Sequence, residues 1–320
     1  MVDLLASSAP SAARPGSATG ARAREWRAPF PLDLRLTLSP HYRGPGDPAY
    51  RIDEAGTVWR TSLTPDGPGT IRIVPGAGPV TAQAWGPGAD WLLDGLPALL
   101  GAGDDPSGFD PAAHPVLRDA ARRHPGFRIG RTGRLLEALV PAILEQKVVT
   151  LEAHRAWRTL LAQYGTPPPG PAPRGMRVFP PPSTWRSIPT WDWHKAGVEG
   201  VRAQTIIRAC TVASSLERLL DSGGASRKLR TIPGIGVWTA AETLQRAAGD
   251  PDAVSVGDYH IPRTVGWALA GRDRTDDAQM LELLRPYQGH RYRVTRLIEL
   301  SGLRPPRRGP RMSVRDYRRF

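Results

Sequence analysis

Hydrophobic and polar residues follow two different periods along this chain, and the change from one to the other falls near residue 112. Before that point, apolar residues alternate with polar ones in four runs, at 32–38, 57–63, 70–74 and 80–85. Alternation of this kind is typical of strands that bury one face. The sequence therefore predicts a small β-rich domain over 29–112, with a short helix over 90–100.

From residue 113 onward, apolar residues recur every three to four positions, which predicts amphipathic helices. We expect helical segments over 114–123, 134–151, 151–164, 185–188, 191–197 and 201–220. The proline-rich stretch 165–182 is expected to be a loop between them. The second part of the chain is thus predicted to be an all-α body over 113–303.

The two ends of the chain show neither period. Residues 1–28 are rich in Ala, Ser, Gly and Arg, which is typical of a disordered tail. Residues 304–320 carry seven Arg and one acidic residue. This composition indicates a basic C-terminal arm on or near nucleic acid, and a solvated tail without a partner is an equal alternative.

The net charge of +13 is unevenly distributed. Residues 29–112 hold 5 basic and 10 acidic residues, whereas residues 113–320 hold 34 and 18. A polyanion is therefore expected to contact the second part of the chain. A GC-rich coding bias would explain why Arg outnumbers Lys, but not why the charge gathers in one part.

The cysteine count excludes several classes of site. Cys210 is the single cysteine, so the chain can form neither a disulfide framework nor a cysteine-ligated zinc or iron–sulfur cluster. No apolar run approaches the ~18 residues of a membrane span, and the first residues lack the apolar core of a secretory signal. We expect a cytoplasmic, DNA-associated protein without a membrane partner.

A glycine-punctuated turn lies at Leu229–Ala240, with the sequence Leu-Arg-Thr-Ile-Pro-Gly-Ile-Gly-Val-Trp-Thr-Ala. Pro233 ends a preceding helix, and Gly234 and Gly236 allow positive φ and close approach of a ligand to the backbone. The helix that follows begins with amide groups that have no internal partner, which suits a phosphate. A helix–helix turn that binds nothing is the alternative for a bare Gly-x-Gly, but the complete string favours a helix-hairpin-helix element.

An aspartate follows this hairpin at a defined distance. Asp258 lies eighteen residues beyond Ala240, after Gly257 and before a new helical pattern, where an N-cap is its simplest role. A helix-hairpin-helix followed by such an Asp resembles the helix-hairpin-helix–GPD superfamily of DNA glycosylases. Within it, the chain most resembles the bacterial 3-methyladenine DNA glycosylase II (AlkA) type, also in its segments 124–128 and 142–146.

This resemblance implies an α+β fold with an N-terminal antiparallel β/α domain followed by an all-α body. It also implies that Asp258 is the catalytic carboxylate and that the hairpin contacts the DNA backbone through Gly234, Ile235, Gly236 and Thr239. In the family, the hairpin backbone also holds a monovalent cation, K⁺ or Na⁺. No other cofactor is expected, and no iron–sulfur cluster.

The resemblance also nominates a base pocket and a wedge. Trp238 and Tyr287 match pocket aromatics, although each is otherwise an ordinary core aromatic. Glu242 stands where the family has a tyrosine, and it could bind a cationic base or be a solvated helix residue. Lys147, after Gln146, stands at the position of an apolar wedge, so either its aliphatic stem or Val148 would fill the gap in the duplex; an exposed helix lysine is the alternative.

The chemistry follows from these residues. An alkylated purine is already cationic, so one carboxylate suffices for its release, and aromatic stacking favours it by about 1–2 kcal/mol. Trp238 occupies the position of the Schiff-base lysine in strand-cleaving relatives, which predicts a monofunctional glycosylase. The alternatives are a glycosylase for oxidised, deaminated or mismatched bases, and a non-catalytic helix-hairpin-helix module. We expect a monomer that acts on damaged double-stranded DNA.

Overall fold

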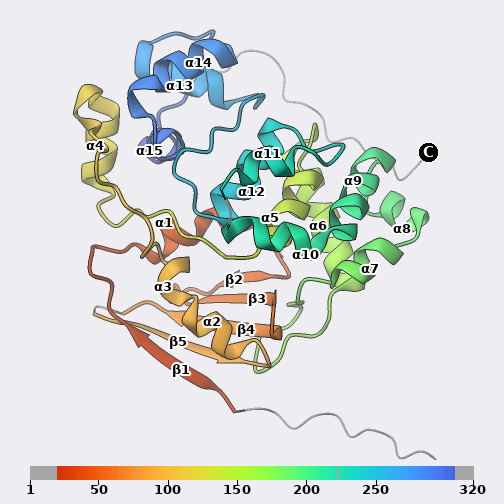
Figure 1. The fold of residues 1–320 in the computed structure, drawn as a ribbon. Helices are drawn as coiled ribbons and strands as arrows, with labels where there is room; N and C mark the ends of the chain where they lie inside the picture. The colour runs from red at the N-terminus through yellow and green to blue at the C-terminus, as the bar shows by residue number, and fades with distance from the viewer. Residues whose placement is uncertain (1–19, 77, 222, 307–320) are drawn as a thin grey trace, which may run out of the picture.

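The computed structural model describes residues 20–76, 78–221 and 223–306 and consists of an antiparallel sheet beneath a larger helical body (Figure 1). The α+β class expected from the sequence is therefore confirmed. Three hydrophobic cores support it, one under the sheet, one in the centre of the helical body and one in its C-terminal part.

The sheet has five antiparallel strands in the order β1-β5-β4-β3-β2. Their bounds are β1 Arg22–Trp26, β2 Tyr50–Ile52, β3 Val58–Thr64, β4 Gly67–Val74 and β5 Val80–Trp85. A two-residue loop joins β3 to β4, where Thr64 is paired with Gly67. The short helices α2 (Ala89–Asp94) and α3 (Leu96–Leu99) cover the buried face, and Ile71, Ile73 and Leu96 are fully buried there.

Two predictions about the N-terminal part were wrong. The leucine run forms helix α1 (Leu34–Leu38) instead of a strand, because Asp33 accepts a hydrogen bond from Leu36 N at 2.9 Å and starts the helix. The predicted tail over 1–28 also contains β1, which pairs with β5. Residues 1–19 of that tail and 307–320 of the predicted basic arm lie outside the described residues.

The helical body extends from residue 115 to residue 301. Its helices are α4 Pro115–Arg123, α5 Leu135–Leu144, α6 Thr150–Tyr164, α7 Pro182–Ser187, α8 Thr190–Lys195, α9 Gly200–Thr211, α10 Ala213–Glu217, α11 Ala225–Leu229, α12 Val237–Ala247, α13 Ile261–Ala270, α14 Asp277–Leu284 and α15 Arg291–Ser301. Short 3₁₀ turns lie at Ser39–His41, Pro111–Ala113, Arg218–Asp221 and Arg285–Tyr287. None of the described helices has both the length and the apolar character needed to cross a membrane.

Helix α5 lies at the centre of the body and contacts α6, α9 and α12. It ends at Leu144, although the sequence predicted one helix from 134 to 151. The five residues between α5 and α6 form a turn instead, in which Lys147 is exposed, and we call residues 145–149 the wedge segment. This break places Gln146 and Lys147 on a loop beside the hairpin.

Candidate active site

Helices α11 and α12 form the two sides of the expected hairpin, and Gly234 lies in the turn between them. Its φ of 98° is one that residues with a side chain rarely adopt. A Cβ at this position would lie 2.1 Å from Thr205 Oγ1 on α9. Ile235 is buried in the central core, and its N–H donates to Ile232 O at 3.0 Å. The hairpin therefore has a fixed conformation.

Gly236 differs from Gly234 in its backbone conformation and in its surroundings. It is the N-cap of α12 with φ −94°, so only Gly234 confirms the expected positive φ. A Cβ on Gly236 would meet no atom within 4 Å, and no side chain caps the helix N-terminus. The first amides of α12 thus lie beside an open surface, where the helix dipole favours an anion.

Asp258 lies directly beside this hairpin. Its Oδ1 accepts hydrogen bonds from His260 N at 2.7 Å and Ile261 N at 2.9 Å, at the start of α13. The N-cap residue of α13 is His260 and not Asp258 as predicted, but Asp258 still binds the first amides of the helix from two residues earlier. Its Oδ2 accepts a hydrogen bond from Trp238 Nε1 at 3.0 Å, in the first turn of α12. Trp238 thus holds the carboxylate against the hairpin helix.

A cleft of about 1450 Å³ begins at the residues that follow Asp258. Tyr259, whose exposed fraction is 81%, and His260 line it together with Val149 of the wedge segment. Asp258 itself lies at the edge of this cleft and is not one of its lining residues. The far wall includes Arg296 of α15, which pairs with Glu299.

Gln146 joins the wedge segment to the hairpin. Its Nε2 donates to Gly234 O at 2.9 Å and to Thr239 Oγ1 at 2.8 Å. Thr239 is buried, so its side chain holds Gln146 rather than facing a ligand. The amide of Gln146 thus ties the wedge segment to the hairpin, and its part in the wedge stays a prediction.

Lys147 is the only non-glycine residue with positive φ among the described residues, at 54°. Its side chain is exposed at the tip of the wedge segment. A left-handed backbone costs about 1–2 kcal/mol for a residue with a Cβ, and such strain gathers at functional sites. The structure therefore places Lys147 on a strained loop instead of the exposed helix face considered as the alternative.

Glu242 is buried, and both of its carboxylate oxygens are occupied. One accepts from Ser255 Oγ, and the other pairs with Arg246 Nη1 at 2.7 Å. Arg246 Nε also donates to Pro40 O at 2.9 Å. Burial alone would lower the pKa of Arg246, but the Glu242 carboxylate raises it above its usual range. Glu242 is thus neither the solvated residue nor the free carboxylate considered from the sequence.

Tyr287 does not join these residues. It is buried in the C-terminal core, where its hydroxyl contacts His114 Nδ1 and its ring lies 6.0 Å from that of Phe109. The predicted pocket role is therefore corrected in favour of the core reading. Tyr292 is buried in the same core, and burial raises the pKa of its hydroxyl.

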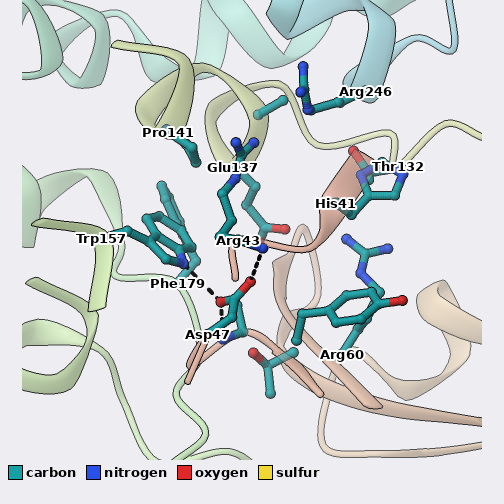
Figure 2. Close-up of a pocket in the computed structure, with 14 residues that line it drawn as sticks. His41, Arg43, Asp47, Arg60, Thr132, Glu137, Pro141, Trp157, Phe179 and Arg246 are labelled. Atoms are coloured by element: carbon teal, nitrogen blue, oxygen red, sulfur yellow. Dashed lines mark hydrogen bonds between the residues drawn. The ribbon is translucent and has the colours of Figure 1, made fainter. Parts of the chain in front are cut away.

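Arginines gather where the sheet meets the helical body (Figure 2). Arg43, Arg60 and Arg246 line a small, partly open cavity of about 40 Å³ together with His41 and Glu137. Burial and the surrounding arginines hold the pKa of His41 well below its usual range. Burial also raises the pKa of Glu137, although Arg134 opposes the shift. The sequence reasoning missed this junction, since its members are far apart along the chain.

No protein-family model matches the chain. The chain is 30% identical over 252 residues to the probable bifunctional transcriptional activator/DNA repair enzyme AlkA of Mycobacterium tuberculosis. The alignment covers 73% of this chain and 48% of that protein, so the chain spans about half the length of the curated relatives it matches.

Solved structures show the same fold at low sequence identity. A 3-methyladenine DNA-glycosylase from Archaeoglobus fulgidus matches with a TM-score of 0.71 at 17% identity, covering 88% of this chain and 98% of that one. The apo form of an 8-oxoguanine glycosylase/lyase from Clostridium acetobutylicum matches with 0.65 at 11% identity, covering 85% and 93%. At these identities the similarity shows the fold alone.

The chain has a helix–turn–helix hairpin with Gly234 and Gly236, in a fold that it shares with the solved DNA glycosylases it matches. Its sequence is similar to that of the AlkA protein of Mycobacterium tuberculosis.

Proposed function

We propose that this protein is a monofunctional DNA glycosylase of base excision repair that hydrolyses the N-glycosidic bond of alkylated purines in duplex DNA. The observation that carries the proposal is the position of Asp258, whose carboxylate is hydrogen-bonded to Trp238 on the first turn of the hairpin helix. The start of α13 uses only Oδ1, and a protein that only binds DNA would have no need to hold Oδ2 at the hairpin. The names of the AlkA relative and of the Archaeoglobus fulgidus neighbour agree with this substrate class.

The reaction uses three parts of the site. The open amides at Gly236 bind a backbone phosphate, and Lys147 fills the space left when the nucleotide rotates out of the helix. Asp258 stabilises the positive charge that develops on the sugar as the glycosidic bond breaks and its electron pair leaves with the base. Water then attacks C1′, and its proton passes to the carboxylate or to solvent.

The absence of strand cleavage is part of the proposal. Trp238 occupies the position that a Schiff-base lysine would need, and its indole already donates to Asp258. Lys147 lies on a different segment, and it follows Gln146, which is held at the hairpin. We therefore expect an abasic site with an intact backbone as the product.

A monovalent cation at the hairpin is a further part of the proposal. The hairpin turn, residues 230–236, offers no carboxylate or imidazole, so a cation would be held by backbone carbonyl oxygens. Those of Ile232 and Gly234 each accept one described hydrogen bond, from Ile235 N and Gln146 Nε2, and each retains a second lone pair. K⁺ or Na⁺ bound there would add positive charge beside the phosphate. We also expect a monomer located at the nucleoid in the cytoplasm.

A second candidate is a glycosylase for oxidised or deaminated bases. Glu242 replaces an aromatic residue of the family, so a base at this site would lose one stacking partner, although Glu242 itself is bonded to Ser255 and Arg246. The structural similarity to the 8-oxoguanine glycosylase/lyase supports the fold for this class but not the chemistry.

The test is base release from methylated duplex DNA, followed by a panel of lesion oligonucleotides. We expect 3-methyladenine and 7-methylguanine in the supernatant and alkali-labile sites in the DNA. Asp258→Asn should lower the rate about 10³-fold, because the charge is lost while one amide oxygen can still cap α13. DNA binding should be retained. Full activity of this variant would remove Asp258 from the mechanism, and a borohydride-trapped adduct would contradict the monofunctional proposal.

A further inference from the structure

Three consecutive residues, the last one of α5 and the two that follow it, are each bound to a different part of the molecule. Leu144 O accepts a hydrogen bond from Arg202 Nη1 on α9 at 2.8 Å. Glu145 forms an ion pair with Arg43, which belongs to the N-terminal domain. Gln146 binds the hairpin through Gly234 and Thr239. The next residue is Lys147, in its left-handed conformation. The backbone of the wedge segment is thus fixed immediately before its tip.

The ion pair between Arg43 and Glu145 is largely removed from solvent. The exposed fractions of the two side chains are 8% and 18%. Burial lowers the pKa of Arg43, and the nearby Glu145 carboxylate is the largest effect that opposes this shift. Water therefore competes little with this ion pair, and dissolved salt screens it less than it would screen an exposed pair.

Arg43 itself is held by Asp47, as Figure 2 shows. Asp47 Oδ2 accepts from Arg43 N at 2.9 Å, and Asp47 Oδ1 accepts from Trp157 Nε1 at 2.9 Å. Trp157 belongs to α6, the helix that begins directly after the wedge segment. The loop 43–47 of the N-terminal domain is therefore bound both to Glu145, the first residue of that segment, and to α6, the helix that follows it.

The loop also approaches α6 more closely than a side chain would allow. Gly44 has φ +78°, and a Cβ there would lie 2.7 Å from His154 Nδ1. This close contact sets the distance between the loop and α6. It therefore also sets how far the Arg43 guanidinium extends toward Glu145.

We infer that Arg43 is a positioning residue for the wedge: through Glu145 it holds the segment so that Lys147 enters duplex DNA. The N-terminal β domain thereby takes part in lesion extrusion through a side chain that contacts neither Asp258 nor the hairpin. The inference rests on the proposed function. It assigns to Arg43 a role needed for double-stranded substrate and not for single-stranded substrate, in which there is no gap to fill.

The experiment compares Arg43→Gln with Arg134→Gln as a matched control. Arg134 pairs with Glu217 at the opposite end of α5, and the exposed fractions of those side chains, 14% and 19%, are similar. Two quantities are measured on the full-length proteins. One is kcat/KM for the same lesion in duplex and in single-stranded DNA, and the other is hydrogen exchange at the amides of Gln146 and Lys147.

For Arg43→Gln we expect kcat/KM on duplex to fall about tenfold, while the single-strand value changes less than about twofold. The amides of Gln146 and Lys147 should exchange faster. Arg43→Lys should recover part of the duplex rate, because it retains the charge. Arg134→Gln should leave the duplex-to-single-strand ratio unchanged.

An equal loss on both substrates, or an unchanged ratio in folded Arg43→Gln, would overturn the inference. If Arg43→Gln does not fold, the double variant Arg43→Gln/Glu145→Gln removes both charges and takes its place under the same criteria. If the wild-type protein releases no base from any substrate, the proposed function fails instead. In that case only the hydrogen exchange at the amides of Gln146 and Lys147 tests the inference. An exchange rate in Arg43→Gln equal to that of the wild type would refute it.

Discussion

The two ends of helix α12 use polar groups in opposite ways. At its start, the amides beside Gly236 face an open surface, and Trp238 and Asp258 are only partly buried. At its other end, Glu242 and Arg246 are buried and bonded to each other and to residues from distant parts of the chain. The first end is open, and we propose that a phosphate binds there, whereas the second end holds the helical body to the N-terminal domain.

This difference has a simple energetic origin. A polar group at the surface is solvated until a ligand replaces the water, so leaving it without a protein partner costs little. A charge inside the protein is tolerated only when an opposite charge and hydrogen bonds compensate for its lost hydration. Substitutions at the two ends should therefore separate activity from stability.

The largest effect on stability is expected for Glu242→Gln. The substitution leaves Arg246 buried without its counter-charge, which should lower the free energy of unfolding by about 3–5 kcal/mol. Urea denaturation measures the loss. The control is Glu299→Gln, because Glu299 has an exposed side-chain fraction of 36% and its pair with Arg296 should contribute less than about 1 kcal/mol. Similar losses in the two variants would contradict the assigned role of the buried pair.

Gly234 and Gly236 should show the same separation of stability from activity within one turn. Gly234→Ala introduces a Cβ at positive φ and against Thr205, so it should destabilise the protein by more than about 1–2 kcal/mol. Gly236→Ala meets no protein atom, and we expect its free energy of unfolding to change by less than about 0.5 kcal/mol. Its methyl group should instead weaken duplex binding, measured by fluorescence anisotropy. Unaltered duplex affinity would place the phosphate elsewhere.

The smallest effect is a pH dependence at the domain junction. The pKa of His41 is well below the ordinary value of about 6.5 in the folded protein, so the unfolded chain binds more protons between the two values. Stability from this residue is therefore full above about pH 6.5 and declines as the pH falls. His41→Gln should reduce the loss of unfolding free energy between pH 7.5 and 5.5. The pKa of His154 is also lowered, so part of the slope should remain.

Local patterns were sufficient for some elements and misleading for others. The hairpin and a structural role of Asp258 at the start of α13 were predictable, because each depends on residues within a few positions of one another. The run 32–38 was predicted as a strand because its leucines alternate, yet Leu34, Thr37 and Leu38 are buried at helical spacing. Alternating leucines fit either period over such a short run, and the cap at Asp33 decided between them.

The site itself was predictable only in part. Sequence spacing and resemblance identified Asp258, Trp238 and the hairpin, and the structure brings these residues together. Spacing could not tell that Tyr287 packs in the C-terminal core, because helix rotation and tertiary packing decide which aromatic reaches a pocket.

By itself, the sequence determined the α+β class, the glycine turn and the carboxylate that follows it, because short-range sterics and helix capping act within a few residues. The tertiary structure decided the partners of the buried charges. Arg43 reaches Glu145 across 102 positions, and Arg246 reaches Pro40 across 206. Such pairs depend on how the sheet packs against the helical body, since a charge leaves water only where an opposite charge from elsewhere in the fold meets it.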